Sequence, residues 1–286
     1  MIVEDNMLIK RVSPSQKQVE DSVYHLDKIL TAEIQGIAAT SEKRASYLAD
    51  KMGPFLGRQD FPVDKVTGTI KDIQKYATDD FVHQRSTFND YLKGAEEMQT
   101  LSAHVDKRFT LTGPPYDAEW TTGSFAYAHK DTGEFGFSTI DGVAGAGVGI
   151  FITSSENTIG QISPYVPVNY SWINVVVNGG WASCNGSVAV RIFDLTNSNV
   201  PVINYGAPLW NRTQNGTGLI NGPDGVTYIG SAISGEMLFP LYANRLYLAW
   251  VWCWGWSGSS DSGRTTVASG NVSCKMPFAV IRPRHL

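Results

Sequence analysis

The first part of the chain repeats apolar or small residues at helical spacing. Between Ser13 and Met52 the steps follow 4, 3 and 4 three times over, an eleven-residue repeat of 3.67 residues per turn that predicts a nearly straight helix. The repeat positions are Val19, Val23, Leu26, Leu30, Ile34, Ile37, Ser41, Ala45, Leu48 and Met52. Ser13–Pro14 is typical of a helix start and Gly53–Pro54 of a helix stop.

A second stretch, after the linker at 53–62, repeats the same spacing. Its positions are Val66, Ile70, Ile73, Ala77, Phe81, Gln84, Phe88, Leu92 and Ala95. Two isolated helices of this length would form a thin core, so we expect a coiled-coil bundle of hairpins from several chains. The expected oligomer interface comprises Val19, Val23, Leu26, Leu30, Ile34, Ile37, Leu48, Val66, Ile70, Ile73, Phe81, Phe88 and Leu92. A monomeric hairpin folded back on itself is the alternative.

From residue 134 onward the pattern changes to short apolar runs separated by turn residues. Turns such as Asn178–Gly179, Asn185–Gly186 and Asn221–Gly222 are typical of an antiparallel β-sandwich or jelly roll. The predicted fold is therefore α+β with segregated halves. We expect an N-terminal arm (1–12), a helical oligomerisation or attachment domain (13–111), a Gly-Pro-Pro linker (112–115) and a β-sandwich (116–286).

The sequence RLYLAWVWCWGWSG, which begins at Arg245, places a tryptophan at every second position. In a strand Trp250, Trp252, Trp254 and Trp256 would share one side, where four open indoles would invite aggregation. We expect this tryptophan ridge to be hidden in the sandwich core or at a subunit interface. A glycan platform is the alternative, because indoles stack on sugar rings.

Charge and hydropathy indicate which classes of binding partner to expect. The net charge of −4 argues against nucleic acid as a partner. Residues 112–286 contain 18 charged side chains among 175, which suggests that other copies cover much of their surface. The start MIVEDNMLIKRV is unlike a signal peptide, and no run reaches 18 apolar residues, so we expect a soluble chain without a membrane span.

The residues give little sign of catalysis. Cys184, Cys253 and Cys274 are odd in number and lack CxxC spacing, which favours buried free thiols and neither a metal site nor a cofactor. No GxSxG motif is present, and we expect no enzyme activity. Trp181, Trp210 and Arg212 stand near Asn and Gly residues, so we predict them in loops as ligand-binding candidates.

The glycine-rich stretch Gly142–Ile152 has two interpretations. It departs from the GxGxxG pattern because Ile150 stands where the third glycine belongs. A strand that lets neighbouring backbones approach closely is the favoured interpretation. A membrane-inserting segment is the alternative.

In layout the chain resembles trimeric fibre, spike or decoration proteins of bacteriophages and other virions. The resemblance lies in the apolar repeats at 19–52 and 66–95 and in the run NYSWINVVVNGGWASCNGSVAVRIFDLTNS from Asn169. It implies a non-enzymatic structural and adhesive homotrimer in a virion, bound to other virion proteins through the helical part or the N-terminal arm. The β tip would then meet a host surface glycan or receptor.

Two other functions stay open. Trp181, Trp210 and the tryptophan ridge would suit a soluble lectin, with a cytoplasmic location if the chain is not part of a virion. The helical hairpin and Gly142–Ile152 would suit a membrane-active, pore-forming toxin.

Overall fold

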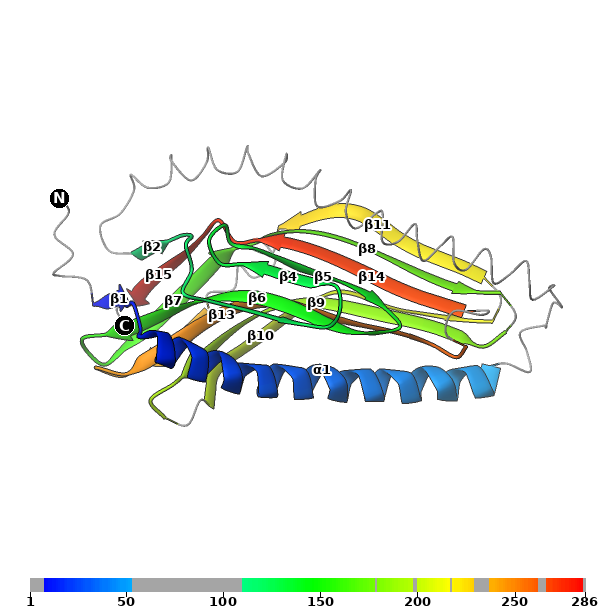
Figure 1. Cartoon of the computed structure of the whole chain (residues 1–286), viewed down its shortest axis with the longest axis horizontal. Helices are drawn as coiled ribbons and strands as arrows, with labels where there is room; N and C mark the ends of the chain where they lie inside the picture. The colour runs from blue at the N-terminus through cyan, green and yellow to red at the C-terminus, as the bar shows by residue number, and fades with distance from the viewer. Residues whose placement is uncertain are drawn as a thin grey trace.

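The chain folds as one long helix that lies along an antiparallel β-sandwich (Figure 1). The computed structural model describes residues 8–52, 110–177, 179–197, 200–216, 218–228, 237–261 and 266–284. Helix α1 (Gln16–Met52) precedes the long strands in the chain. The predicted fold class, a helical segment followed by an antiparallel sandwich, is confirmed. The second predicted helix, with Val66, Ile70, Ile73, Phe81, Phe88 and Leu92, lies outside the described residues.

Three sheets build the sandwich. The six-stranded sheet has the order β1 (Ile9–Arg11), β6 (Gly142–Ser154), β13 (Leu246–Ser259), β9 (Trp181–Asp194) and β10 (Val200–Asn215), and β3 (Ala118–Thr122) also pairs with β6. The five-stranded sheet has the order β11 (Gly218–Tyr228), β8 (Pro167–Val176), β14 (Thr266–Lys275), β5 (Glu134–Ile140) and β4 (Ala126–His129). The four-stranded sheet has the order β12 (Met237–Leu241), β7 (Thr158–Tyr165), β15 (Phe278–Arg284) and β2 (Thr110–Thr112).

The main core lies between the six-stranded and the five-stranded sheets. Alternate residues of each strand point into it, as the period of two requires. Phe135 and Phe137 of β5, Val251 of β13 and Val272 of β14 are all at most 1% exposed and belong to this cluster. The other side of the six-stranded sheet faces α1.

Helix α1 starts two residues later than the sequence predicts. Ser15, not Ser13, is the cap: its Oγ accepts a hydrogen bond from the Gln18 backbone N at 3.3 Å. The Gln18 side chain accepts one in return from the Ser15 backbone N at 2.9 Å. This reciprocal capping box satisfies two donors that the first helical turn leaves without a partner.

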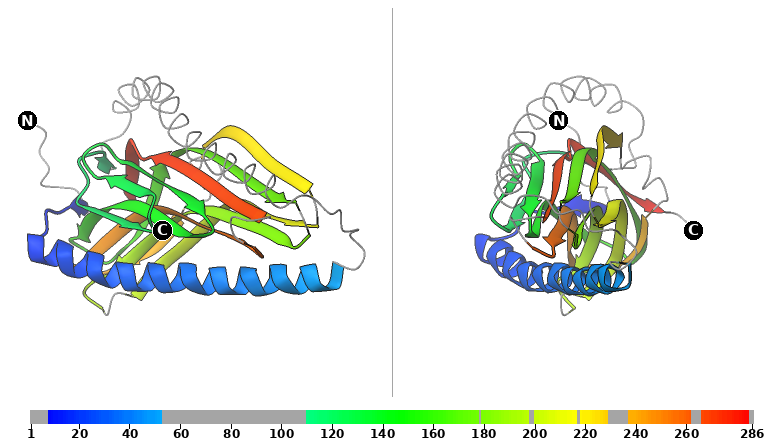
Figure 2. Two further views of the ribbon diagram at one scale, coloured as in Figure 1. Left: turned by 45° about the vertical axis from the view of Figure 1, so that its right-hand side comes forward. Right: turned by 90° about the vertical axis from the view of Figure 1, so that its right-hand side faces the viewer.

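The apolar stripe of α1 packs on the outer face of the six-stranded sheet. Leu26, Leu30 and Ile34 are at most 2% exposed and form one cluster with Trp250 and Trp252, which are fully buried. An end-on view shows α1 beneath one face of the sandwich (Figure 2, right). Trp250 and Trp252 are therefore hidden beneath the chain's own helix and lie outside the core between the two sheets, which is one of the two locations that the sequence predicts. Trp254 of the same ridge is half-buried.

The predicted oligomer interface needs a correction at these positions. Leu26, Leu30 and Ile34 are occupied within the chain, because the sheet that they cover presents a continuous apolar surface. Val19 and Val23 pack partly against the same cluster. Ile37 and Leu48 are half-buried, since the buried side of α1 turns toward Ala38, Ala45 and Ala49 in the second half of the helix.

Glycines of β6 make room for the indoles of β13. Gly149, Gly147 and Gly145 lie directly opposite Trp250, Trp252 and Trp254. A Cβ on Gly149 would lie 2.4 Å from the Trp250 ring, and one on Gly147 would lie 2.6 Å from the Trp252 Cβ. The Gly-rich stretch Gly142–Ile152 is thus a sheet strand that other elements approach closely, as the favoured interpretation states.

Polar contacts fix the helix over the ridge. The Trp120 indole N–H donates to Asp27 of α1 at 2.8 Å. Arg191 of β9 is 2% exposed, forms an ion pair with Glu33 of α1, and lies 5.0 Å from the centre of the Trp252 ring. These contacts place charges at defined positions, so they set the register of α1 on the sheet.

The N-terminal segment is part of the sandwich from residue 9 onward. β1 pairs with β6, with Ile9 opposite Ser154, and Arg11 binds the Asp117 carboxylate at 2.7 Å. At the other boundary, Thr110–Thr112 pairs with β15 as β2. Residues 9–11 of the predicted arm (1–12) therefore form a strand of the sandwich. Strand β2 covers the end of the predicted helical domain (13–111) and the first residue of the predicted linker (112–115).

Candidate binding site at the sandwich edge

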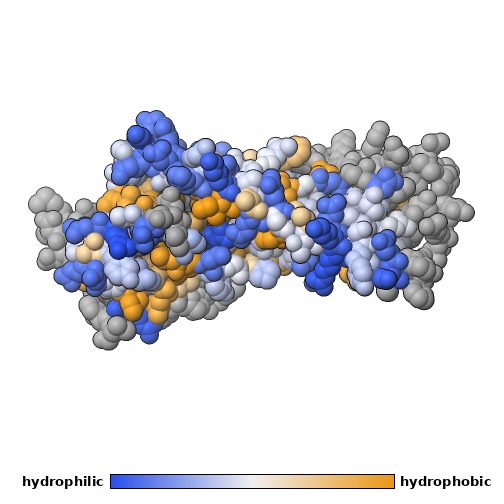
Figure 3. All heavy atoms as spheres, turned by 90° about the horizontal axis from the view of Figure 1, so that it is seen from below, coloured by the Kyte–Doolittle hydropathy of each residue, from blue (hydrophilic) through white to orange (hydrophobic). Residues whose placement is uncertain are grey.

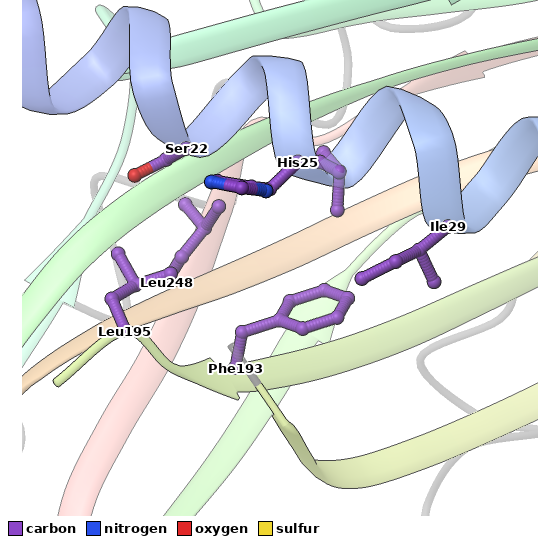
Figure 4. Close-up of a pocket in the computed structure, with 7 residues that line it drawn as sticks. Ser22, His25, Ile29, Phe193, Leu195 and Leu248 are labelled. Atoms are coloured by element: carbon purple, nitrogen blue, oxygen red, sulfur yellow. The ribbon is translucent and has the colours of Figure 1, made fainter. Parts of the chain in front are cut away.

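A small pocket opens between α1 and the ends of β9 and β13 (Figure 4). Its lining comprises Ser22, His25, Leu26, Ile29, Phe193, Leu195 and Leu248. The empty volume is about 200 Å³ with the open mouth included, below the range of roughly 300–1,000 Å³ of ligand pockets. Ser22 already donates to the Gln18 carbonyl at 2.7 Å, so few polar groups remain to orient a ligand.

The surface around this pocket combines polar and apolar groups. Figure 3 views the molecule from the α1 side, and its hydrophobic residues gather mainly toward the end where α1 begins. Within the described parts of the chain, no helix is both long and apolar enough to cross a membrane. No group of three or more His, Cys, Asp or Glu residues able to hold a metal occurs among the described residues.

Two of the three predicted ligand-binding residues are buried. Trp181 is 6% exposed and packs on Trp256, with 6.4 Å between ring centres, beside Ala45 of α1. Trp210 is 4% exposed. Both lie in strands and not in loops, because β9 and β10 pair through the Asn and Gly residues that suggested turns. Neither indole offers an open face, so the prediction of two exposed platforms is wrong.

Trp210 nevertheless belongs to a cluster of aromatic and polar residues at one edge of the sandwich. Its ring stacks on Tyr170 of β8 with 5.5 Å between centres and 14° between planes. Trp210 and Arg212 are two positions apart on β10 and so share a side of the strand. Tyr170, Trp172 and Asn174 share a side of β8 for the same reason.

Arg212 is the exposed member of this cluster. Its guanidinium lies 5.8 Å from the centre of the Trp172 ring, within the range of a cation–π contact. Among the described residues its side chain makes one hydrogen bond, from Nη1 to the Asn211 carbonyl at 3.3 Å. A guanidinium has five N–H donors, so Arg212 can bind an acceptor from solution. We name Tyr170, Trp172, Asn174, Trp210 and Arg212 the edge cluster.

The neighbouring strand β11 leaves one side of this cluster without bulk. Gly222 lies opposite Trp172, and the pairing shifts between Gly222 and Gly225. A Cβ on Gly222 would lie 2.0 Å from the Trp172 Nε1, so the indole leans over the glycine. β10 and β11 are the end strands of their sheets. The edge cluster lies beside them, with Arg212 exposed, Tyr170 half-buried, and Trp172, Asn174 and Trp210 buried.

Buried polar groups hold the edge cluster in place. Asn174 is fully buried and donates from Nδ2 to the Arg212 carbonyl at 3.1 Å. Ser183 donates to the same carbonyl at 3.2 Å. Burial raises the pKa of the neighbouring Cys184 thiol to about 12, while Trp210 and Asn174 act in the opposite direction. The thiol stays protonated at neutral pH and is a poor nucleophile there.

Sequence reasoning missed Tyr170, Trp172 and Asn174. The signal is present in the alternation of NYSWIN, where three large or polar residues share one side of a strand. The alternation does not indicate which strand of the other sheet faces these residues. The approach of β8 to β10 depends on how two sheets pack, which no local pattern encodes.

Comparison with known proteins gives only distant similarities. No protein-family model matches the chain, and no curated protein matches it. A solved structure described as "CBM4 structure and function" is similar at 10% identity and a TM-score of 0.22, over 62% of this chain and 96% of that one.

Two further solved structures are similar at the same level. A xylan-binding domain from CBM 22 matches at 10% identity and a TM-score of 0.17, over 64% of this chain and 92% of that one. The enzymatically active domain of bacteriophage CBA120 tailspike protein 4 matches at 13% identity and a TM-score of 0.17, over 59% and 19% respectively. At these TM-scores we draw no functional conclusion from the similarities.

Proposed function

We propose that the chain is a non-enzymatic binding protein that recognises a hydroxyl-rich glycan at the edge cluster. The observation that carries the proposal is the exposed Arg212 guanidinium over the Trp172 ring, at an edge where Gly222 adds no side chain. Guanidinium donors suit sugar hydroxyl or carboxylate oxygens, and the Trp172 ring, which is 8% exposed, supports the guanidinium from the protein side.

Binding without catalysis agrees with the chemistry of this edge. Cys184, a nucleophile by type, is kept protonated by burial. The buried donors Asn174 and Ser183 are used on the Arg212 backbone carbonyl, so they position the strand and do not activate a substrate. Pre-organised side chains on strands reduce the entropy that a ligand must overcome on binding.

A glycan array with neutral and acidic sugars, followed by calorimetry with the best binder, tests the proposal. Arg212→Ala should weaken binding about tenfold or more, because a lost hydrogen bond to a charged group costs about 1.5–3 kcal/mol. Arg44→Ala, at an exposed position of α1, is the matched control and should bind as the wild type does. The proposal fails if no glycan binds above background, or if Arg212→Ala binds equally well.

A second proposal follows from the resemblance to virion fibres and from the outer surface of α1. Tyr24 and Tyr47 are 58% and 62% exposed, and Ile37 and Leu48 are half-buried, so this helix keeps apolar surface for a partner. We infer a symmetric, trimeric assembly in a virion. Light scattering on the purified chain should give three times the mass of one chain, reduced by Tyr47→Ser with Leu48→Ser. A single-chain mass for the wild type at micromolar concentration would refute the assembly.

A further inference from the structure

Two of the three cysteines face each other across the main core. Cys253 lies on β13 of the six-stranded sheet and Cys274 on β14 of the five-stranded sheet, and they are 0% and 1% exposed in the same cluster. Phe137 marks the level at which these strands meet. It pairs with Val272 in β14, and its ring would lie 2.6 Å from a Cβ on Gly255 in β13. Cys274 stands two positions from Val272 on β14, and Cys253 stands two positions from Gly255 on β13.

The two thiols are close enough to interact directly. After burial, the neighbouring Cys253 side chain is what raises the pKa of the Cys274 thiol further. Cys184 has different neighbours, Trp210 and Asn174, and lies on β9 at the edge side of the sheet. Sandwich folds accommodate disulfides that join their two sheets. The arrangement therefore selects one pair among three thiols.

We propose that Cys253 and Cys274 form a disulfide that joins the two sheets when the chain folds in an oxidising medium, while Cys184 remains a thiol. With glutathione disulfide as oxidant, one cysteine sulfur attacks its S–S bond and releases a glutathione thiol. The second cysteine sulfur then displaces the remaining glutathione from the mixed disulfide. One S–S bond breaks and one forms, and the two protons and two electrons leave with two glutathione thiols.

Burial determines when this bond forms. The pKa of Cys274 is raised well above its ordinary value because burial disfavours the thiolate, and the thiolate is the species that attacks a disulfide. Neither thiol is reachable for glutathione in the folded chain. We therefore expect oxidation during folding, and slow oxidation of the chain once it has folded reduced.

The experiment refolds the full chain from denaturant in a glutathione redox buffer and, in parallel, in excess reductant. Each sample is then denatured, treated with iodoacetamide and weighed by mass spectrometry. Oxidative refolding should leave one alkylated cysteine, which peptide mapping assigns to Cys184, and reductive refolding should leave three. The oxidised chain should melt about 5 °C higher, as expected for a disulfide that closes a loop of this size.

Matched variants separate this pair from other pairings. Cys184→Ala should still form the bond and leave no alkylated cysteine, whereas Cys253→Ala and Cys274→Ala should each leave two. The wild-type mass and peptide map decide the question even if a variant fails to fold. Three alkylated cysteines after oxidative refolding, or a bond between Cys184 and either other cysteine, would overturn the proposal.

Discussion

At the scale of single residues, glycine and tryptophan act as complementary partners across β6 and β13. Each indole of Trp250 and Trp252 occupies space that a side chain on the opposite β6 residue would need. The two indole N–H groups find no acceptor in the described part of the chain, so these rings are held by packing. The sequence pattern predicts the shared side of the indoles and a glycine-rich strand, but it does not predict that the two pair with each other.

We expect Gly149→Ala to lower the free energy of unfolding by about 1–3 kcal/mol, the usual cost of overpacking a filled core. The new Cβ would lie 2.4 Å from the rigid Trp250 ring, which cannot move under α1. Urea denaturation followed by tryptophan fluorescence measures the change.

Gly36→Ala is the matched control for this substitution. Gly36 is exposed on α1, with nothing within 4 Å of an added Cβ. The same change should therefore stabilise the chain by up to about 1 kcal/mol through helix propensity. An unchanged unfolding midpoint for Gly149→Ala would mean that the indole is not held where we describe it.

At the scale of elements, the spacing of apolar residues predicts α1 and its buried side but not the surface that it covers. A helix with an eleven-residue apolar repeat can pack against another helix or against an apolar sheet, and the repeat does not distinguish the two. The sequence predicts the helix stripe and the tryptophan strand separately. It does not predict that they pack against each other, because that contact depends on tertiary packing. Ile37 and Leu48 belong to the repeat but are only half-buried, because the buried side of α1 turns toward Ala38, Ala45 and Ala49.

Truncation of the stripe tests this packing. Leu30→Ala should cost about 2–5 kcal/mol, because it opens a cavity between α1 and the ridge, where Leu30 is fully buried. Ile37→Ala, at a half-buried position of the same helix, should cost about 1 kcal/mol. Thermal and urea unfolding of both variants give the two values. Equal costs would contradict a helix seated on the sheet through Leu30.

At the scale of the whole molecule, composition misleads about domains. The charged, tryptophan-free first part and the glycine-rich second part suggest two units. Yet β1 pairs with β6, and Leu26, Leu30 and Ile34 share a cluster with Trp250 and Trp252. A change in composition along the chain indicates which segments have apolar surface to bury. It does not indicate whether the apolar surfaces of two segments pack against each other. The low charge of residues 112–286 predicts cover by other copies, whereas the surface at Trp250 and Trp252 is covered by α1 of the same chain.

The seating of α1 on β13 also affects how the protein is made. Leu30 precedes Trp250 by 220 positions in the sequence. At translation rates of about 5–20 residues per second, the nascent helix waits roughly 10–40 s before its docking strand leaves the ribosome. Until then the apolar side of α1 lacks the strand that covers it in the folded chain, so we expect the nascent chain to be most prone to aggregation in this interval.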